Sequence, residues 1–168
     1  KMAADGDGNL CDLQCEEYIM ARRNIQFDTV ETTEEARSNR WLHDKGTPLH
    51  NVGRLLEKKN LTIVRTYCAT RNDMFDAINR KNDVIVVVNS AKLYGHVNAH
   101  TNDPNHAVIV INYDSKEETI EIFDPTSQNK SDIYSLQLFE QSWKDSSNYM
   151  VCVKVKDNTY NPHPIFID

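Results

Sequence analysis

The sequence predicts an α+β fold in which an N-terminal helix packs on an antiparallel β-sheet. Helical patterns come first and most strand patterns come later, which separates the two kinds of element along the chain. Two runs, residues 84–88 and 107–111, are apolar throughout, and the strand at 107–112 is expected to be buried on both faces. Residues 106–124 have the pattern of a β-hairpin, with residues 114–118 as its polar turn.

The first helix is expected to begin near Cys11. Asn9 is expected to cap it by accepting the N–H of Asp12, and the side chains at positions 11, 15, 18 and 19 form one buried stripe. Cations at positions 22 and 23, followed by an asparagine, suit the end of this helix. Thr32 is expected to cap a second short helix that runs toward Asn39.

The rest of the chain continues this order. Residues 49–59 place apolar side chains at helical spacing, and Asn72 is expected to cap a helix through residue 78. The remaining expected elements are strands at 61–66, 84–89 and 149–155, a helix at 136–143 and a polar loop at 92–104. Residues 9–157 are expected to form a single domain, with 1–8 as a loose lead-in and 158–168 as a tail.

Composition and charge exclude several classes of partner. The chain has 168 residues and a net charge of −6, without a basic cluster, so nucleic acid is not an expected partner. No apolar run approaches about 18 residues, so membrane insertion is not expected either. We expect a soluble protein, cytoplasmic or secreted, whose four cysteines are reduced.

The ends of the predicted hairpin carry reactive side chains. His106 begins the first strand and Asp124 follows the second, and the start of one antiparallel strand lies near the end of its partner. The two side chains are therefore expected to be neighbours in space. An imidazole oriented by a carboxylate provides two of the three groups of a nucleophilic triad. A hydrogen-bonded pair with a purely structural role would explain the same pattern.

Cys11 is the candidate nucleophile. A thiol in the first turn of a helix has a lowered pKa, because the helix dipole and the free N–H groups stabilise the thiolate. The alternative nucleophile is Cys15, one turn further along, for which Asn9 stands six positions upstream. The structural alternative for either cysteine is a small buried residue of the helix.

With these residues in place, the chain from about Asn9 to about Lys154 resembles papain-like bacterial cysteine peptidases of the bacteriocin-leader-processing, or peptidase-like, type. The resemblance depends on the order and spacing of short segments at residues 11–20 (CDLQCEEYIM), 40–41, 46–48, 52–57, 84–90 (VIVVVNS), 105–110 (NHAVIV), 123–125 (FDP), 139, 143 and 149–151. It implies a papain-like fold and a cysteine-dependent hydrolase, with Cys11 as nucleophile, His106 as general base and Asp124 as its orienting partner. It also implies a peptide or protein substrate and no metal or organic cofactor.

Two positions depart from the pattern of that family. Its members have Gly or a small residue after the nucleophile, where this chain has Asp12, whose carboxylate opposes thiolate formation. They also carry, about six positions before the nucleophile, a Gln that donates to the oxyanion, where this chain has Asp5. Asn9 is the replacement donor, and Asn9 and Asp12 are the expected oxyanion and substrate-binding positions.

Three alternatives stay open from the sequence. The same thiol chemistry would serve a glutamine deamidase or a transglutaminase-type bacterial effector, because these enzymes share the acyl-enzyme. The departures at Asp5 and Asp12 would also fit a catalytically weakened domain that binds peptide in its cleft. His96, His100 and His106 would together suit zinc only if a helix replaced the predicted loop, because i, i+4 ligation needs helical spacing.

Overall fold

The computed structural model describes residues 10–96 and 102–155 of the chain. Asn9, His100, the predicted lead-in and the predicted tail lie outside the described residues. The helices are α2 (Cys11–Arg22), α3 (Thr29–Ser38), the 3-10 turn η1 (Leu49–Asn51), α4 (Arg54–Lys58), α5 (Arg71–Asn79), α6 (Ser90–Leu93) and α7 (Leu136–Lys144). The strands are β1 (Ile63–Thr66), β2 (Asp83–Val88), β3 (His106–Asp114), β4 (Thr119–Phe123), β5 (Asp132–Ser135) and β6 (Met150–Val153).

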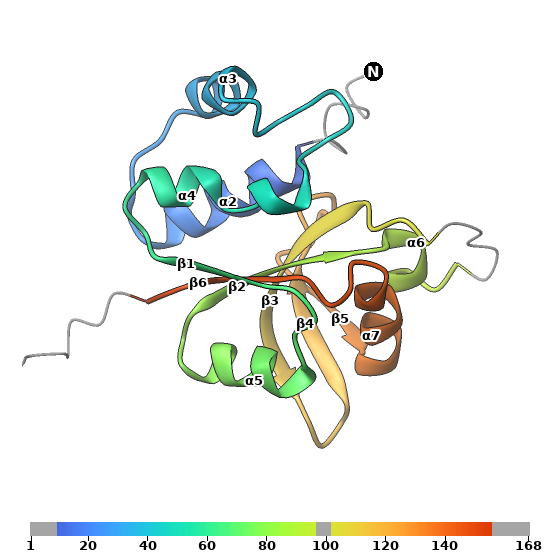
Figure 1. Ribbon diagram of the computed structural model, residues 1–168. Coiled ribbons are helices and arrows are strands. Elements are labelled where there is room, and N and C mark those ends of the chain that lie inside the picture. The colour runs from blue at the N-terminus through green and yellow to red at the C-terminus, as the bar shows by residue number, and fades with distance from the viewer. Residues whose placement is uncertain (1–9, 97–101, 156–168) are drawn as a thin grey trace, which may run out of the picture.

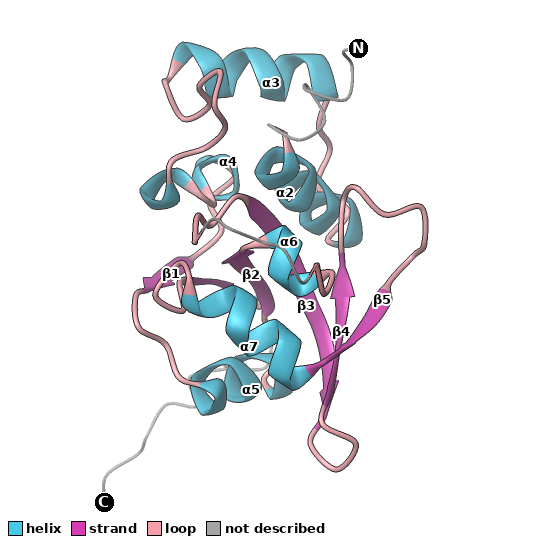
Figure 2. Ribbon diagram, turned by 90° about the vertical axis from the view of Figure 1, so that its right-hand side faces the viewer, coloured by secondary structure: helices cyan, strands magenta, loops and turns pink. Residues whose placement is uncertain are grey.

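The six strands form one antiparallel sheet in the order β1-β6-β2-β3-β4-β5. Figure 1 shows α2, α3 and α4 on one side of this sheet and α5 and α7 on the other. In the turned view of Figure 2, α3 lies farthest from the sheet, beyond α2 and α4. The predicted α+β fold, with an N-terminal helix on an antiparallel sheet, is confirmed. In the described part of the chain, no helix is long and apolar enough to cross a membrane.

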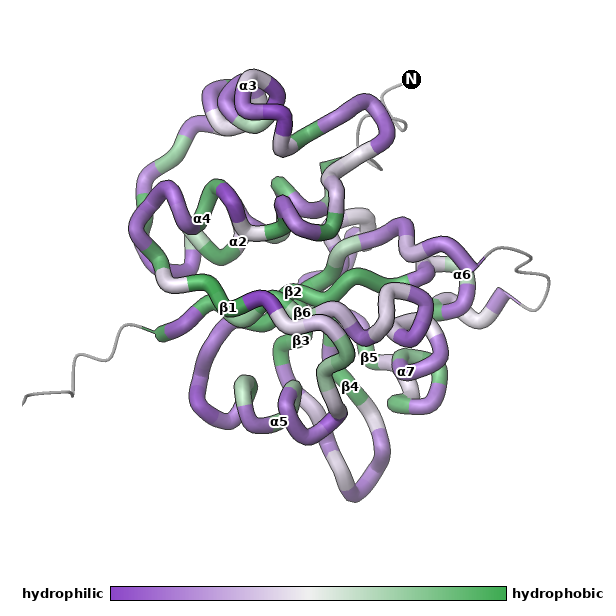
Figure 3. Tube along the Cα trace, viewed as in Figure 1, coloured by the Kyte–Doolittle hydropathy of each residue, from purple (hydrophilic) through white to green (hydrophobic). Residues whose placement is uncertain are grey.

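The central strands are buried on both faces, and each face belongs to a different core. On β2, Ile85 and Val87 pack with α2, whereas residues 84, 86 and 88 pack with α5 and α7, because neighbouring strand residues point to opposite faces. These apolar strands contrast with the largely hydrophilic α3 in Figure 3. Ile19 and Met20 of α2 are fully buried, and at roughly 1.5–3 kcal/mol each they hold this helix against the sheet.

Strands β3 and β4 form the predicted hairpin, with a bulge between Val110 and Asn112. The first five residues of β3 are buried, but from residue 111 onward the strand alternates, and Asn112 is exposed. The strand buried on both faces is therefore shorter than the predicted run of residues 107–112. Beyond the bulge, β3 packs on α5, where the ring of Tyr113 stacks on that of Phe75.

The ends of α2 differ in how well they match the prediction. Its N-cap is Leu10, which makes no side-chain capping bond, and the predicted cap, Asn9, lies outside the described residues. The helix ends at the predicted cations, but its C-cap is Arg23 rather than Asn24, the C-cap that the sequence suggests. Asn24 follows at a φ of 59°, a left-handed conformation that asparagine tolerates better than most residues.

In the two other helices with a predicted cap, a residue further upstream is the N-cap. Helix α3 begins after Asp28, whose extended backbone lets its carboxylate accept an N–H of the first turn. Thr32 instead lies inside α3 and donates its hydroxyl to Glu17. Helix α5 begins after Thr70, which forms a reciprocal capping box, whereas Asn72 lies within the helix.

The predicted helix at residues 49–59 is broken in two by Gly53. This residue has a φ of 92°, which L side chains rarely adopt. A Cβ at this position would also lie 3.3 Å from both Ile63 and Val151. Glycine therefore permits both the turn between η1 and α4 and the close approach of this turn to the sheet.

The sequence pattern misses two short elements. Helix α6 overlaps the start of the predicted polar loop, and the side chain of Asn89 accepts the N–H groups of Ala91 and Lys92 at its beginning. Strand β5 is an edge strand without an apolar run, and its Ile133 is 69% exposed. Neither element buries enough apolar surface to leave a periodic signal.

Candidate active site

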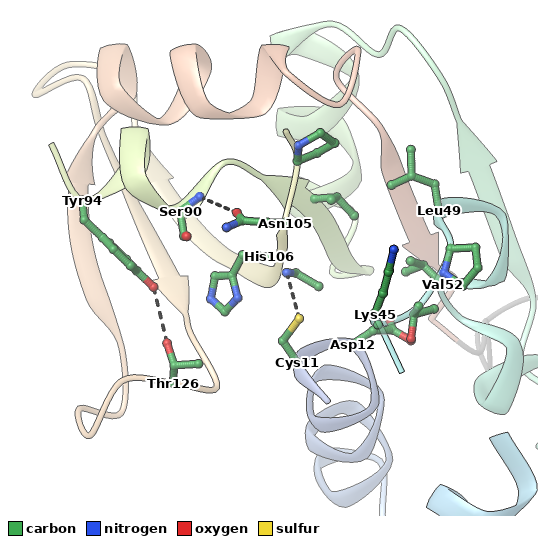
Figure 4. Close-up of a pocket in the computed structure, with 16 residues that line it drawn as sticks. Cys11, Asp12, Lys45, Leu49, Val52, Ser90, Tyr94, Asn105, His106 and Thr126 are labelled. Carbon is green, nitrogen blue, oxygen red and sulfur yellow. Dashed lines mark hydrogen bonds between the residues drawn. The ribbon is translucent and has the colours of Figure 1, made fainter. Parts of the chain in front are cut away.

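A pocket of about 920 Å³ opens where the start of α2 meets the start of β3. Three segments line most of it: the first two residues of α2, residues 45–49, and residues 104–107. Tyr94 and Thr126 also contribute. Figure 4 shows Cys11 at the end of α2, directed toward β3, with His106 beside it.

Cys11 is the first residue of α2 and is 9% exposed. Its Sγ accepts the backbone N–H of Ala107 at 3.4 Å, which ties the helix start to β3. Burial, the largest influence, raises the pKa of the thiol. Hydrogen bonding and charge from His106, together with the N–H groups of Ala107 and Asp12, outweigh burial and hold this pKa below its ordinary value. The surroundings of Cys11 therefore favour a thiolate.

His106 is the first residue of β3, and Asp124 directly follows β4. His106 Nε2 lies 2.7 Å from Asp124 Oδ1, and both residues are buried. Burial lowers the pKa of His106, but Asp124 and Cys11 raise it to about 9. Since Nε2 faces Asp124, Nδ1 is the ring nitrogen left for proton exchange with Cys11. The fold thus brings Cys11, His106 and Asp124 together.

Asp124 accepts hydrogen bonds from three residues. Besides His106, the Tyr94 hydroxyl donates to Oδ2 at 2.5 Å, and Thr126 donates its N–H and its hydroxyl to Oδ1 at 2.9 and 2.8 Å. Burial raises the pKa of Asp124, but these donors and the charge of His106 hold it well below its usual range. Asp124 is therefore a carboxylate that can orient the imidazole and stabilise its protonated form.

Tyr94 and Thr126 were not identified from the sequence. Thr126 had a usable signal, because Asp and Asn side chains commonly accept the N–H two residues further on. Tyr94 had none, since its hydroxyl reaches Asp124 only because α6 folds back beside the hairpin. Burial and Asp124 raise the pKa of Tyr94, so its hydroxyl keeps the proton that it donates.

Cys15, the alternative nucleophile, lies one turn further along α2 and has no exposed surface. Its thiol donates to the carbonyl of Ala107 at 3.4 Å, and it is not among the residues that line the pocket. Burial, and then the negative charges of Cys11 and Asp12, raise its pKa well above the ordinary value. All four cysteines are free, as predicted.

The predicted oxyanion and substrate-binding positions have different outcomes. Asn9 lies outside the described residues. Asp12 lines the pocket and is 3% exposed, and Glu16, one turn further along α2, acts on the pKa of its carboxyl group. The backbone N–H of Asp12 is directed at the Cys11 thiol. The start of α2 therefore presents backbone donors beside the sulfur, as an oxyanion site requires.

The alternative zinc site depends on His100, which lies outside the described residues. The ring of Tyr94 lies near both of the other histidines, with centroid distances of 6.1 Å to His96 and 6.5 Å to His106. Among the residues that the structure describes, no three His, Cys, Asp or Glu side chains gather as metal ligands.

A thiol at a helix start, with an imidazole and a carboxylate on two neighbouring strands, is the arrangement of papain-like thiol hydrolases, which can perform nucleophilic acyl transfer. Comparison with known protein families leads to the same class. The model of the Peptidase_C39 like family matches residues 18–151, and the chain belongs to this family. This membership indicates a cysteine peptidase and hence a hydrolase. The matched region contains His106 and Asp124 and begins after Cys11.

A solved structure shares the fold. A crystal structure described as that of a C39-like peptidase from Bacillus anthracis superposes with a TM-score of 0.55 at 17% sequence identity. The alignment covers 66% of this chain and 60% of the other. No curated protein matches the sequence. The family match is to the broad C39-like group, without distinguishing a leader-processing branch.

Proposed function

We propose that this chain is a cysteine peptidase that cleaves peptide amide bonds through a Cys11–His106–Asp124 triad. The observation that carries the proposal is the placement of Cys11 and His106 on the same pocket, with His106 Nε2 2.7 Å from Asp124 Oδ1. Membership of a peptidase family supports a peptide or protein substrate, and a pocket of about 920 Å³ leaves room for several residues of an extended chain.

The proposed reaction follows from the placement of these groups. His106 takes the thiol proton, and the thiolate of Cys11 attacks the substrate carbonyl carbon. Backbone N–H groups at the start of α2 donate to the resulting oxyanion. As the C–N bond breaks, the imidazolium returns its proton to the leaving amine and a thioester remains. Water, deprotonated by His106, then attacks the thioester and releases the acid. Asp124 orients the ring and stabilises its cation throughout.

Selective labelling tests the nucleophile. At neutral pH, iodoacetamide should alkylate Cys11 much faster than the exposed Cys68, which serves as an internal reference. Cys11→Ala should abolish this fast labelling and lower peptide hydrolysis by roughly 10⁴-fold or more. Cys15→Ala is the matched control one turn away, and it should retain both. Uniform labelling of all four cysteines would contradict the proposal, and fast labelling of Cys15 would contradict the choice of nucleophile.

The products distinguish peptide hydrolysis from the other reactions of the same thioester. A peptidase yields a new α-amino group, whereas a glutamine deamidase releases ammonia and leaves the chain intact. A transglutaminase joins the substrate to an added amine. We expect new α-amino groups in the wild type and none with Cys11→Ala. Ammonia release without chain cleavage would assign the site to deamidation.

A further inference from the structure

Next to Cys11, α2 carries two acidic side chains that are almost completely buried. Asp12 is 3% exposed and Glu16 is 1% exposed. They stand one helical turn apart, so they share a face of the helix. Neither takes part in the proposed proton transfer between Cys11 and His106. Acidic side chains are almost never fully buried unless they are paired, so their surroundings must supply a partner.

The two carboxyl groups lie close enough for each to act on the pKa of the other. Because an ionised carboxylate only accepts, they can hydrogen bond to each other only if one of them carries a proton. Glu16 also accepts the backbone N–H of Leu56, at 3.2 Å from Oε1, and that of Gly53. Asp12 Oδ1 is buried and has no hydrogen-bond partner among the described residues.

No contacting cation neutralises this carboxyl pair in the described part of the chain. The titratable groups that face it come from β1, α4, residues 45–49, the start of β6 and α2 itself: Arg65, Arg54, Lys45, Tyr149, Cys11 and Cys15. The guanidinium groups of Arg65 and Arg54 are engaged by Glu57 and by backbone and amide oxygens. A bound proton, rather than a salt bridge, is therefore what offsets the negative charge of the pair.

We propose that Asp12 and Glu16 share a single proton at neutral pH, which makes Glu16 a positioning residue for the Cys11 thiolate. This inference rests on the proposed function, since it concerns Cys11 as the nucleophile. With one shared proton, the pair places one negative charge near the thiol. With none, it would place two charges there, and their mutual repulsion would separate the carboxyl groups.

The energetics of burial support the shared proton. Burial raises the pKa of Asp12 to about 6 and that of Glu16 well above its ordinary value. A charged Cys11 also raises the pKa of Asp12. This coupling is reciprocal, so an ionised Asp12 opposes the thiolate by the same free energy. The shared proton limits the repulsion on the Cys11 thiolate to that of a single negative charge. Separately, the contacts of Glu16 with Gly53 and Leu56 hold α2 against α4.

Two isosteric variants separate a singly protonated pair from two ionised carboxylates. In Glu16→Gln, the amide copies the protonated acid, because it donates to Asp12 and still accepts from Leu56. Asp12→Asn removes the carboxyl group next to Cys11 and leaves Glu16, one turn further from the thiol, as the acid of the pair. Glu17→Gln is the matched control, since Glu17 is the next residue of α2 and accepts from Thr32. The readout is the pH dependence of Cys11 alkylation by iodoacetamide, with Cys68 as the internal reference.

We expect Glu16→Gln and Glu17→Gln to leave the apparent pKa of Cys11 within about 0.3 unit of the wild type. Asp12→Asn should lower it by about one unit, which is a tenfold gain in labelling at the acid limit. If Glu16→Gln lowers this pKa as far as Asp12→Asn does, both carboxyl groups are ionised and the inference is wrong. If Asp12→Asn also leaves it unchanged, the pair does not act on the thiol and the positioning role is wrong.

An infrared measurement tests the proton without using the thiol. At neutral pH, the C=O band of a buried protonated carboxyl group should be present in the wild type and in Cys11→Ala, and absent from Glu16→Gln. Its absence from the wild type, where no substitution disturbs folding, would overturn the shared proton. Its presence together with slow labelling of Cys11 would contradict the proposed nucleophile while leaving the proton-sharing pair intact.

Discussion

Two buried acidic regions flank Cys11, one on the sheet and one on its own helix, and they respond to burial in opposite ways. Asp124 and Asp12 are 1% and 3% exposed. The pKa of Asp124 is nevertheless held below its usual range, whereas that of Asp12 is raised to about 6. Since both side chains are almost inaccessible to solvent, the hydrogen-bond donors around each group and the charge of His106 decide whether it is a carboxylate or an acid.

The difference in donors follows from secondary structure. Asp124 stands where the chain leaves β4, so the N–H and hydroxyl of Thr126 turn back to it and Tyr94 reaches it from α6. Asp12 and Glu16 stand on a helix whose own N–H groups, after the first turn, are bonded within the helix. In the described part of the chain, the backbone N–H that donates to this pair at hydrogen-bond distance is that of Leu56 in α4. The strand end therefore provides the orienting carboxylate and the helix provides a proton-holding pair.

Asp124→Asn removes the donor-rich carboxylate, and of these changes we expect it to have the largest effect. The amide keeps the shape of the side chain but no longer stabilises the imidazolium, so kcat should fall by about 10³–10⁴-fold. In the wild type the imidazolium persists to about pH 9, so activity should decline above that pH. The alkaline limb should move to lower pH in the variant. Steady-state kinetics across the pH range measure both effects.

Asp114→Asn is the matched control for this substitution. Asp114 ends β3 in the same hairpin but is exposed and accepts only from its own turn. Its loss should change kcat by less than about twofold. Comparable losses in the two variants would show that a negative charge on the hairpin, rather than contact with His106, is what matters.

The sequence predicts these two regions unequally. His106 and Asp124 could be paired in advance, because antiparallel geometry joins the start of one strand to the end of the next, and both strands have strong apolar patterns. Cys11 could be predicted as the nucleophile for a similar reason, since the start of a helix leaves a local signal in the sequence. Asn9, Leu10 and Asp28 show the limit of such signals, because several neighbouring residues compete to begin each helix and the choice depends on tertiary packing.

The Asp12–Glu16 pair could not be predicted as a buried unit. Two acids one turn apart on a helix are most often a solvated face, and only the packing of α4 on α2 covers them. That packing depends on the break at Gly53, which the helical spacing of residues 49–59 conceals. The contact of Tyr94 with Asp124 could not be predicted for the same reason, because it requires the short α6 at the start of an apparently polar loop.

Unfolding measurements should give the two acids effects of opposite sign. The folded-state pKa of Asp12 is raised above the unfolded value of about 4. The folded protein therefore holds more protons between about pH 4 and pH 6, and its free energy of unfolding falls as the pH rises through this window. Asp12→Asn avoids that loss and should be more stable than the wild type at neutral pH by up to roughly 3 kcal/mol.

For Asp124 the sign is reversed. Its folded-state pKa is lowered, so its contribution is present above about pH 4 and is lost as the pH falls through the folded-state pKa. Asp124→Asn should therefore be less stable at neutral pH, by roughly 3 kcal/mol, because it leaves a buried imidazolium without its partner. Urea unfolding at pH 4 and pH 7 measures both differences. Effects of the same sign in the two variants would refute the donor-based distinction.

The smallest effect is expected from Tyr94→Phe, which removes one donor from Asp124 and leaves the contact with His106 in place. A hydrogen bond to a charged group contributes about 1.5 kcal/mol or more, so kcat should fall by about tenfold. Tyr134→Phe is the matched control, since its ring lies 6.3 Å from that of Tyr94 and its hydroxyl donates to no described residue. If both variants lose activity equally, the surroundings of the two tyrosine rings, rather than the donor to Asp124, are responsible. If neither does, the remaining bonds from His106 and Thr126 are sufficient to hold the carboxylate.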